Sequence, residues 1–298
     1  MRVATFNVLF AHRSDGPGAW SDRRPLVRRA IARARPDLLG LQEVFPSTLD
    51  DIAEVIGDLT LLPGPTTGAP RMFDLSVPGE WVLRALRTRR PPSLRELAQA
   101  RSERMIAGEH LPIAYRPSAF RPLASGGFWI SPTPDRPGSM LSLAATPFLV
   151  HWARFERLDG GPPIVLMNGH FGHAPWHHAP TARVVADRIA ALAPPSGDVI
   201  LIGDFNAWPS SPLLGALTSR EGAALVDAVR TAPEHTGPAT TFHWGRGGER
   251  FGVRLDHVLA RGALRPIRAE VIDEHEGALY PSDHYPLVVE FATAASTS

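Results

Sequence analysis

The chain contains many short apolar segments, and a polar side chain suited to chemistry stands at one end of several of them. The segment 198–203 has an uninterrupted apolar centre, as expected of a strand that is covered on both faces. Further strands are predicted at 2–9, 37–44, 111–116, 126–130, 148–155, 163–168, 240–243, 254–260, 265–271 and 287–291. Many strands with few helices predict packed sheets rather than a helical bundle.

Three segments show the apolar spacing of amphipathic helices. At 24–35 apolar side chains alternate with Arg, Ser21 or Asp22 is the expected N-cap, and Pro25 falls in the first turn. Helices are also predicted at 47–56 and 181–192. The order strand, helix, strand, helix at the start of the chain indicates an α/β fold. We therefore expect a two-layered sheet sandwich flanked by helices.

The domain organisation follows from length and from one change in composition. A chain of 298 residues allows one large domain or two, and we expect a single domain over 1–293 with a frayed tail at 294–298. The segment at about 63–107 begins with Pro, Gly and Thr and then becomes rich in Arg. Short helices are predicted within it at 80–88 and 93–106. We interpret this segment as an insertion over one edge of the core.

The composition excludes several classes of chemistry. Because there is no Cys, thiol catalysis, thiolate metal sites and disulfides are excluded. All 31 basic residues are Arg, which a GC-rich coding bias would explain and which excludes a Lys base. The net charge of +1 argues against broad nucleic-acid binding. We see no membrane-spanning run and no signal peptide, so a cytoplasmic protein is expected.

The polar side chains at the strand ends form a pattern that is more informative than any one of them. A lone Asp after a strand is usually a turn former, and Asp204-Phe205-Asn206 alone would fit an Asx turn. Here carboxylate, amide or imidazole groups recur at six strand ends, and strands hold such groups rigidly while loops shape a pocket. Oxygen ligands of this kind suit Mg²⁺ or Mn²⁺. The residues are Asn7, Glu43, Asn168, His170, Asp204, Asn206, Asp256, His257, Asp283 and His284.

Eight motifs together resemble those of the endonuclease/exonuclease/phosphatase superfamily, which includes deoxyribonuclease I. They occur in that family's order and span nearly the whole chain. The resemblance implies a four-layer α/β/β/α sandwich of two mostly antiparallel sheets. The segments FWIS, TPDRPGS and TTFHWG further resemble a bacterial branch with poorly defined substrates. The eight motifs are TFNVL (5–9), LQEV (41–44), IAYRPSAF (113–120), FWIS (128–131), NGHF (168–171), GDFN (203–206), RLDHVL (254–259) and SDHYPL (282–287).

The resemblance implies a metal site and a cofactor. Glu43 would be the principal metal ligand, Asp283 a second acidic group on the metal, and Asn7 would lie beside them. The expected cofactor is Mg²⁺ or Mn²⁺.

The resemblance also implies roles for catalytic residues. Asp204 and Asn206 would orient and activate the attacking water. His284 would contact the phosphate, with Asp256 fixing its tautomer. His170 would be a second imidazole on the phosphate oxygens.

Three further residues are predicted to contact the substrate: Tyr115, His173 and Trp176. The last two lie in the segment 172–178, GHAPWHH, which is unusually rich in His. This segment is either an ordinary surface loop or a lid on which Trp176 stacks against an organic leaving group. The choice between the two stays open at this point.

The function predicted is metal-dependent hydrolysis of a phosphate mono- or diester of a small molecule, lipid headgroup or nucleotide. A nuclease is the alternative, because the Arg-rich segment could follow a phosphate backbone, but near-neutral charge disfavours it. A catalytically idle binding domain is less favoured, because the acidic and His positions are all filled. The expected partner is the phosphate-ester substrate, and the chain is expected to be a monomer.

Overall fold

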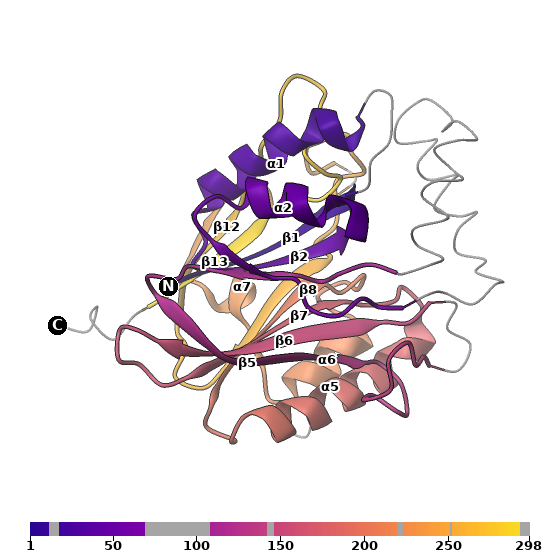
Figure 1. Cartoon of the computed structure of the whole chain (residues 1–298), viewed down its shortest axis with the longest axis vertical. Coiled ribbons are helices and arrows are strands. Elements are labelled where there is room, and N and C mark those ends of the chain that lie inside the picture. The colour runs from indigo at the N-terminus through magenta and orange to yellow at the C-terminus, as the bar shows by residue number, and fades with distance from the viewer. Residues whose placement is uncertain (12–17, 69–107, 142–145, 220–222, 251, 293–298) are drawn as a thin grey trace.

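Two sheets pack face to face and helices cover both outer faces, as Figure 1 shows. The computed structural model describes residues 1–11, 18–68, 108–141, 146–219, 223–250 and 252–292. The predicted helices at 80–88 and 93–106, most of the Arg-rich segment and the tail lie outside these residues. Within the described part, the four-layer α/β/β/α prediction is confirmed.

The seven-stranded sheet has the order β10-β12-β13-β1-β2-β4-β3. Its pairs are antiparallel except β1–β2 and β10–β12, which are parallel. The bounds are β1 (Arg2–Ala11), β2 (Leu38–Val44), β3 (Thr60–Leu62), β4 (Ile113–Tyr115), β10 (Glu234–Thr236), β12 (Pro266–Val271) and β13 (Leu287–Phe291).

The six-stranded sheet has the order β5-β6-β7-β8-β11-β9. Only β7–β8 is parallel among its described pairs. Both sheets are therefore mostly antiparallel, as expected. The bounds are β5 (Phe120–Trp129), β6 (Leu149–Arg157), β7 (Ile164–His170), β8 (Asp198–Asp204), β9 (Val226–Asp227) and β11 (Asp256–Arg261).

Three apolar layers hold the four structural layers together. Helices α1 (Trp20–Ala34) and α2 (Leu49–Val55), the latter preceded by the short η1 (Pro46–Thr48), pack on the seven-stranded sheet. Helices α5 (His178–Leu192) and α6 (Pro212–Thr218) cover the six-stranded sheet. The third layer fills the space between the sheets with side chains such as Leu38, Ile200 and Leu287. Burying apolar surface of this kind is the main favourable term in folding.

The sheets approach each other closely at β2, where Gly40 has no side chain. A Cβ on Gly40 would lie 2.7 Å from side-chain atoms of Asn168 and Ile202 in the opposite sheet. The Asn168 side chain uses this space to cross between the sheets, and it donates hydrogen bonds to the carbonyl oxygens of Leu41 and Pro112 at 2.9 and 3.1 Å. The ends of β2 and β7 are thereby fixed relative to each other.

Several predictions of secondary structure are wrong in detail. Strand β5 begins at Phe120, six residues before the strand predicted at 126–130. Helix α1 begins at Trp20, so Ser21 and Asp22 lie inside it, Ala19 is the N-cap, and Pro25 lies beyond the first turn. Because the helix begins at Trp20, Trp20 and Arg23 lie in buried positions. Tertiary contacts of these side chains set the start of the helix, and local helix propensity does not predict it. The segment 240–243 forms only isolated bridges, through Phe242 to Val253 and His284, instead of a strand.

His151 provides a test of core electrostatics. Its side chain is buried on β6, and Nδ1 donates to the carbonyl oxygen of Leu111 at 2.9 Å. Burial lowers the pKa of His151 to about 4. As the pH falls, His151 therefore takes up a proton near pH 6.5 in the unfolded chain but only near pH 4 in the folded chain. The contribution of the neutral His151 to the free energy of unfolding is complete above pH 6.5 and is lost as the pH falls towards 4.

We expect the wild-type protein to lose about 2 kcal/mol more unfolding free energy than His151→Gln between pH 7 and pH 5. Gln is neutral throughout and can still donate to Leu111. Urea unfolding at the two pH values measures the difference. An equal loss in both proteins would show that His151 is not held neutral by burial.

Candidate active site

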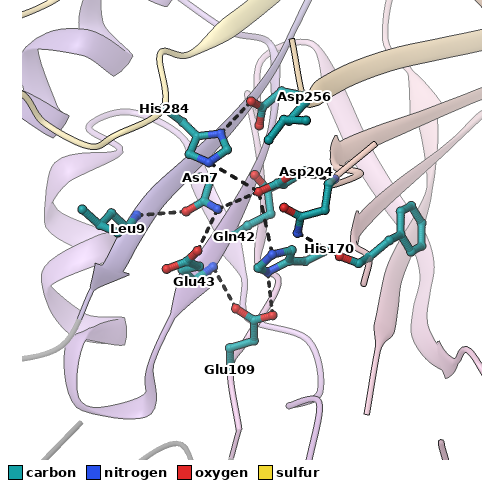
Figure 2. A network of polar contacts seen from close by, with 12 residues as sticks. Asn7, Leu9, Gln42, Glu43, Glu109, His170, Asp204, Asp256 and His284 are labelled. Atoms are coloured by element: carbon teal, nitrogen blue, oxygen red, sulfur yellow. Dashed lines mark hydrogen bonds and ion pairs between the residues drawn. The ribbon is translucent and has the colours of Figure 1, made fainter. Parts of the chain in front are cut away.

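Strand register brings three of the predicted site residues into one row on the six-stranded sheet. His170 on β7 pairs with Asp204 on β8, and Asp204 pairs with Asp256 on β11. Asn7 on β1 faces this row from the seven-stranded sheet and bonds to Asp204 (Figure 2). Residues far apart in the sequence therefore meet at one end of the sandwich.

Asn7 is the side chain that joins the two sheets at this site. Its Nδ2 donates to Glu43 Oε1 at 2.9 Å and to Asp204 Oδ2 at 3.0 Å. Its Oδ1 accepts from the backbone N–H of Leu9 at 3.0 Å, which fixes the orientation of the amide. Asn7 is fully buried, so losing one of these partners would leave a desolvated polar group.

Three residues at the site adopt left-handed backbone conformations without being glycine. The φ angles are 54° at Leu9, 61° at Glu43 and 47° at Asn206. Each such residue costs about 1–3 kcal/mol and persists only where its surroundings enforce it. Asp204 enforces one of them, because its Oδ1 accepts from the Asn206 N–H at 2.9 Å. Strain of this kind clusters where side chains must be aimed for function.

His284 lies between two carboxylates. Its Nδ1 bonds to Asp256 Oδ2 at 2.7 Å, and its Nε2 lies 3.5 Å from Asp204 Oδ2. Burial alone would lower the pKa of His284, but Asp256 and Asp204 outweigh burial and raise the pKa to about 10. The ring is therefore an imidazolium whose Nε2 can donate towards an anion.

His170 forms the second imidazolium, and its partner is a residue that sequence reasoning missed. Nδ1 bonds to Glu109 Oε1 at 2.9 Å, while the other Glu109 oxygen accepts from the Glu43 N–H at 3.1 Å. Burial opposes the charge on His170, but Glu109 and Asp204 raise the pKa of His170 to about 10. Glu109 lies in none of the recognised motifs, directly after the Arg-rich segment, and no local pattern marks it.

The acidic groups offer a fit for a divalent cation. Burial raises the pKa of Glu43, and the nearby charges of Asp283 and Glu109 raise it further against the opposing effect of His170. A bound cation would relieve this repulsion, and carboxylate oxygens are the ligands that Mg²⁺ and Mn²⁺ prefer. Asn7 uses its amide to hold Glu43 in place, as described above.

A second group of donor atoms is less suited to a metal ion. Among the described residues, Asp204, Asp256 and His284 offer ligand atoms within 4.8 Å of one another. However, the His284 ring already pairs with Asp256 and carries a proton. A protonated imidazole does not coordinate a metal, so this group suits contact with a phosphate better.

A cavity of about 940 Å³ opens from these groups. Glu43, His170, Asp204, Asp283 and His284 are among the residues that line it. Asn206 also lines the cavity, and its Nδ2 donates to the Phe171 carbonyl oxygen at 2.9 Å. The predicted substrate contacts His173 and Trp176 both lie on its wall.

Tyr115 is not brought to this site, and its prediction as a substrate contact is corrected. It is buried on β4 opposite Leu38, which begins β2, whereas Glu43 lies at the other end of that strand. Its ring packs on Phe155 with centroids 5.3 Å apart. The alternation of the short strand places Tyr115 in the core between the sheets.

The sandwich with acidic, amide and imidazole groups at one end defines a class of phosphate-ester hydrolases. Residues 4–284 match the sequence profile of the Endonuclease/Exonuclease/phosphatase family. The chain belongs to that family, and the resemblance noted from the motifs is confirmed.

The most similar proteins include curated and solved relatives. A UPF0294 protein of Vibrio vulnificus is 33% identical over 135 residues, which are 45% of this chain and 41% of that protein. The alignment thus covers about two-fifths of the relative's length. An endonuclease/exonuclease/phosphatase of Bacteroides vulgatus has a TM-score of 0.76 at 23% identity, covering 98% of both chains. A mannosyl-6-phosphatase of Bacteroides thetaiotaomicron has a TM-score of 0.75 at 21% identity, covering 98% of this chain and 100% of that one.

Among the helices that the structure describes, none combines the length and apolarity needed to cross a membrane.

The Glu109–His170 contact gives a direct test of the site's electrostatics. In Glu109→Gln the amide keeps the shape but removes the charge, so we expect the pKa of His170 to fall by at least about one unit. NMR titration of the imidazole nitrogens in metal-free protein measures this. Glu54→Gln, on the exposed surface, serves as the matched control. An unchanged His170 pKa in Glu109→Gln would contradict the assigned ion pair.

Proposed function

We propose that this chain hydrolyses phosphate esters with the help of Mg²⁺ or Mn²⁺. The observation that carries the proposal is the buried network in which Asn7 bonds to both Glu43 and Asp204 while two imidazoliums face Asp204. Carboxylates for a cation and positive donors for an anion thus occur within one cavity. Phosphate-ester hydrolysis needs both, because charge develops on the phosphoryl oxygens as water attacks.

The metal would be held by Glu43 and Asp283, with Asn7 bracing Glu43. When bound, such an ion neutralises phosphate charge and stabilises the leaving oxygen.

The remaining residues act on water and phosphate. Asp204 would orient the attacking water and accept its proton, with Asn206 beside it. His284 and His170 would donate from Nε2 to phosphate oxygens. Asp256 holds His284 through Nδ1, which leaves Nε2 facing Asp204 at 3.5 Å, where the attacking water and the phosphate would meet.

The comparisons bear on the type of reaction rather than on the identity of the ester. The mannosyl-6-phosphatase shares the fold with this chain, which supports phosphate-ester hydrolysis as chemistry that this architecture can perform. A small-molecule, lipid-headgroup or nucleotide ester remains the proposed substrate, and nucleic acid is the alternative that the test must include.

The proposal is tested with a panel of phosphomonoesters, phosphodiesters and plasmid DNA, assayed at low salt with Mg²⁺, Mn²⁺ or EDTA. We expect turnover of at least one small ester that EDTA abolishes. Asp204→Asn should lower kcat by about 10²-fold or more, because the amide cannot accept a proton from water.

Asp135→Asn is the matched control, because Asp135 is exposed and pairs only with Arg188 among the described residues. Activity that survives EDTA, or that Asp204→Asn retains, would contradict the proposal. Cleavage of plasmid without cleavage of any small ester would favour the nuclease alternative.

A further inference from the structure

The motifs FWIS (128–131) and TPDRPGS (133–139) supply none of the side chains labelled in Figure 2, but together they fix one tryptophan. The backbone N–H of Trp129 donates to the Pro134 carbonyl oxygen at 2.9 Å, and its ring is buried among apolar side chains. The indole Nε1–H donates to the Thr67 carbonyl oxygen at 2.6 Å. The end of β5 is thereby tied to Thr67.

Thr67 is paired in turn with Glu109. Its N–H donates to the Glu109 carbonyl oxygen at 2.8 Å, and its Oγ1 accepts from the Glu109 N–H at 3.0 Å. Thr67 is buried, so water does not readily replace these contacts. On the other side of the same segment, the His110 N–H donates to the Val44 carbonyl oxygen at 2.7 Å. The backbone at Glu109 is therefore held from both sides.

The two paired segments approach each other too closely for a side chain at Gly108. This residue has a φ of 72°, and a Cβ on it would lie 2.2 Å from Thr67 Oγ1 and 2.5 Å from the Gly68 carbonyl oxygen. Any other residue at this position would push Thr67 away from Glu109, in addition to the strain of a left-handed backbone. The pairing of Thr67 with Glu109 thus depends on a glycine directly before Glu109.

The Glu109 carboxylate connects this pairing to the active site (Figure 2). One oxygen bonds to His170 Nδ1 at 2.9 Å, and the other accepts from the Glu43 N–H at 3.1 Å. The Glu43 backbone is left-handed, with a φ of 61°, a conformation that its surroundings must enforce. Because a short side chain links the carboxylate to its backbone, a shift of the Glu109 backbone would disturb both contacts.

We infer that Thr67 and Trp129 are positioning residues that act on the active site through Glu109. The inference rests on the phosphoesterase function proposed above. Trp129 fixes the carbonyl group of Thr67, and Thr67 fixes the backbone of Glu109. The Glu109 carboxylate then aims the imidazolium of His170 and the backbone of Glu43. Supporting contacts of this kind hold reactive groups within the narrow range of geometry that catalysis requires.

The kinetic test uses Thr67→Val, which removes the hydroxyl and keeps the shape, and Trp129→Phe, which removes the indole N–H. With an ester that the wild-type protein hydrolyses, we expect kcat to fall at least about tenfold in each variant, with a smaller change in KM, because misaligned groups lose mainly transition-state stabilisation. Thr67→Ser keeps the hydroxyl and should restore most of kcat. Thr218→Val is the matched control, because it removes a hydroxyl that bonds to the Leu214 carbonyl oxygen within α6.

A double variant separates action through Glu109 from a direct contact with substrate, since Thr67 also lines the cavity. Glu109→Ala removes both carboxylate contacts, so the placement of its backbone no longer matters. We therefore expect kcat of Thr67→Val/Glu109→Ala to lie within about threefold of Glu109→Ala alone. Losses that multiply, or a rise in KM alone in Thr67→Val, would overturn the inference while leaving phosphoesterase function intact.

Hydrogen exchange tests the inference without turnover. The Glu43 N–H is bonded to the Glu109 carboxylate, whereas the Leu41 N–H in the same strand is bonded to the Pro112 carbonyl oxygen. In Thr67→Val we expect exchange of the Glu43 amide to accelerate at least about tenfold more than exchange of the Leu41 amide.

Equal acceleration of the two amides would indicate a general loss of structure, and unchanged exchange at Glu43 would show that Thr67 does not place the carboxylate. Either result overturns the inference. Failure of the wild-type protein to hydrolyse any ester would instead defeat the proposed function, and the exchange measurement would still decide whether Thr67 positions Glu109.

Discussion

The site depends on one buried amide. Asn7 donates simultaneously to Glu43 on its own sheet and to Asp204 on the facing sheet, so the distance between the two carboxylates is set by a single side chain. Carboxylates brought this close repel each other unless donors or cations lie between them. Because Asn7 is fully buried, its two donor contacts cannot be replaced by water without opening the sandwich.

The backbone around this amide is held by a second buried group. Arg23 of α1 donates to the carbonyl oxygens of Val8, Leu9 and Pro281 at 2.7, 2.6 and 2.7 Å. It thereby ties the end of β1 to the loop that carries Asp283. Ser282 adds a further tie, since its hydroxyl donates to the Asn7 carbonyl oxygen at 2.6 Å. Rigid support of this kind keeps reactive groups within the narrow geometry that catalysis requires.

Much of the fold and of the grouping of the site residues could be predicted from the sequence, because most of the motifs lie at one end of an apolar strand, where local pattern and position agree. The role of Glu109 could not be predicted, because it depends on a contact with His170, which lies 61 residues further along the chain. The prediction that Tyr115 contacts the substrate is wrong, because a motif match does not show which end of the three-residue strand β4 lies near the site. Helix α6 was missed although Ser211 and Pro212 are a normal N-cap and first residue, because seven residues are too few for the helical spacing of its buried Leu side chains to stand out.

The proposed function depends above all on Glu43 as part of a divalent-cation site. Isothermal titration calorimetry of MnCl₂ into the wild-type protein and into Glu43→Gln tests this most directly. Gln retains the shape and the contact to Asn7 but removes the charge. We predict saturable binding to the wild-type protein and binding at least about tenfold weaker in Glu43→Gln. Binding of equal strength in both proteins, or no binding to either, would contradict the claim.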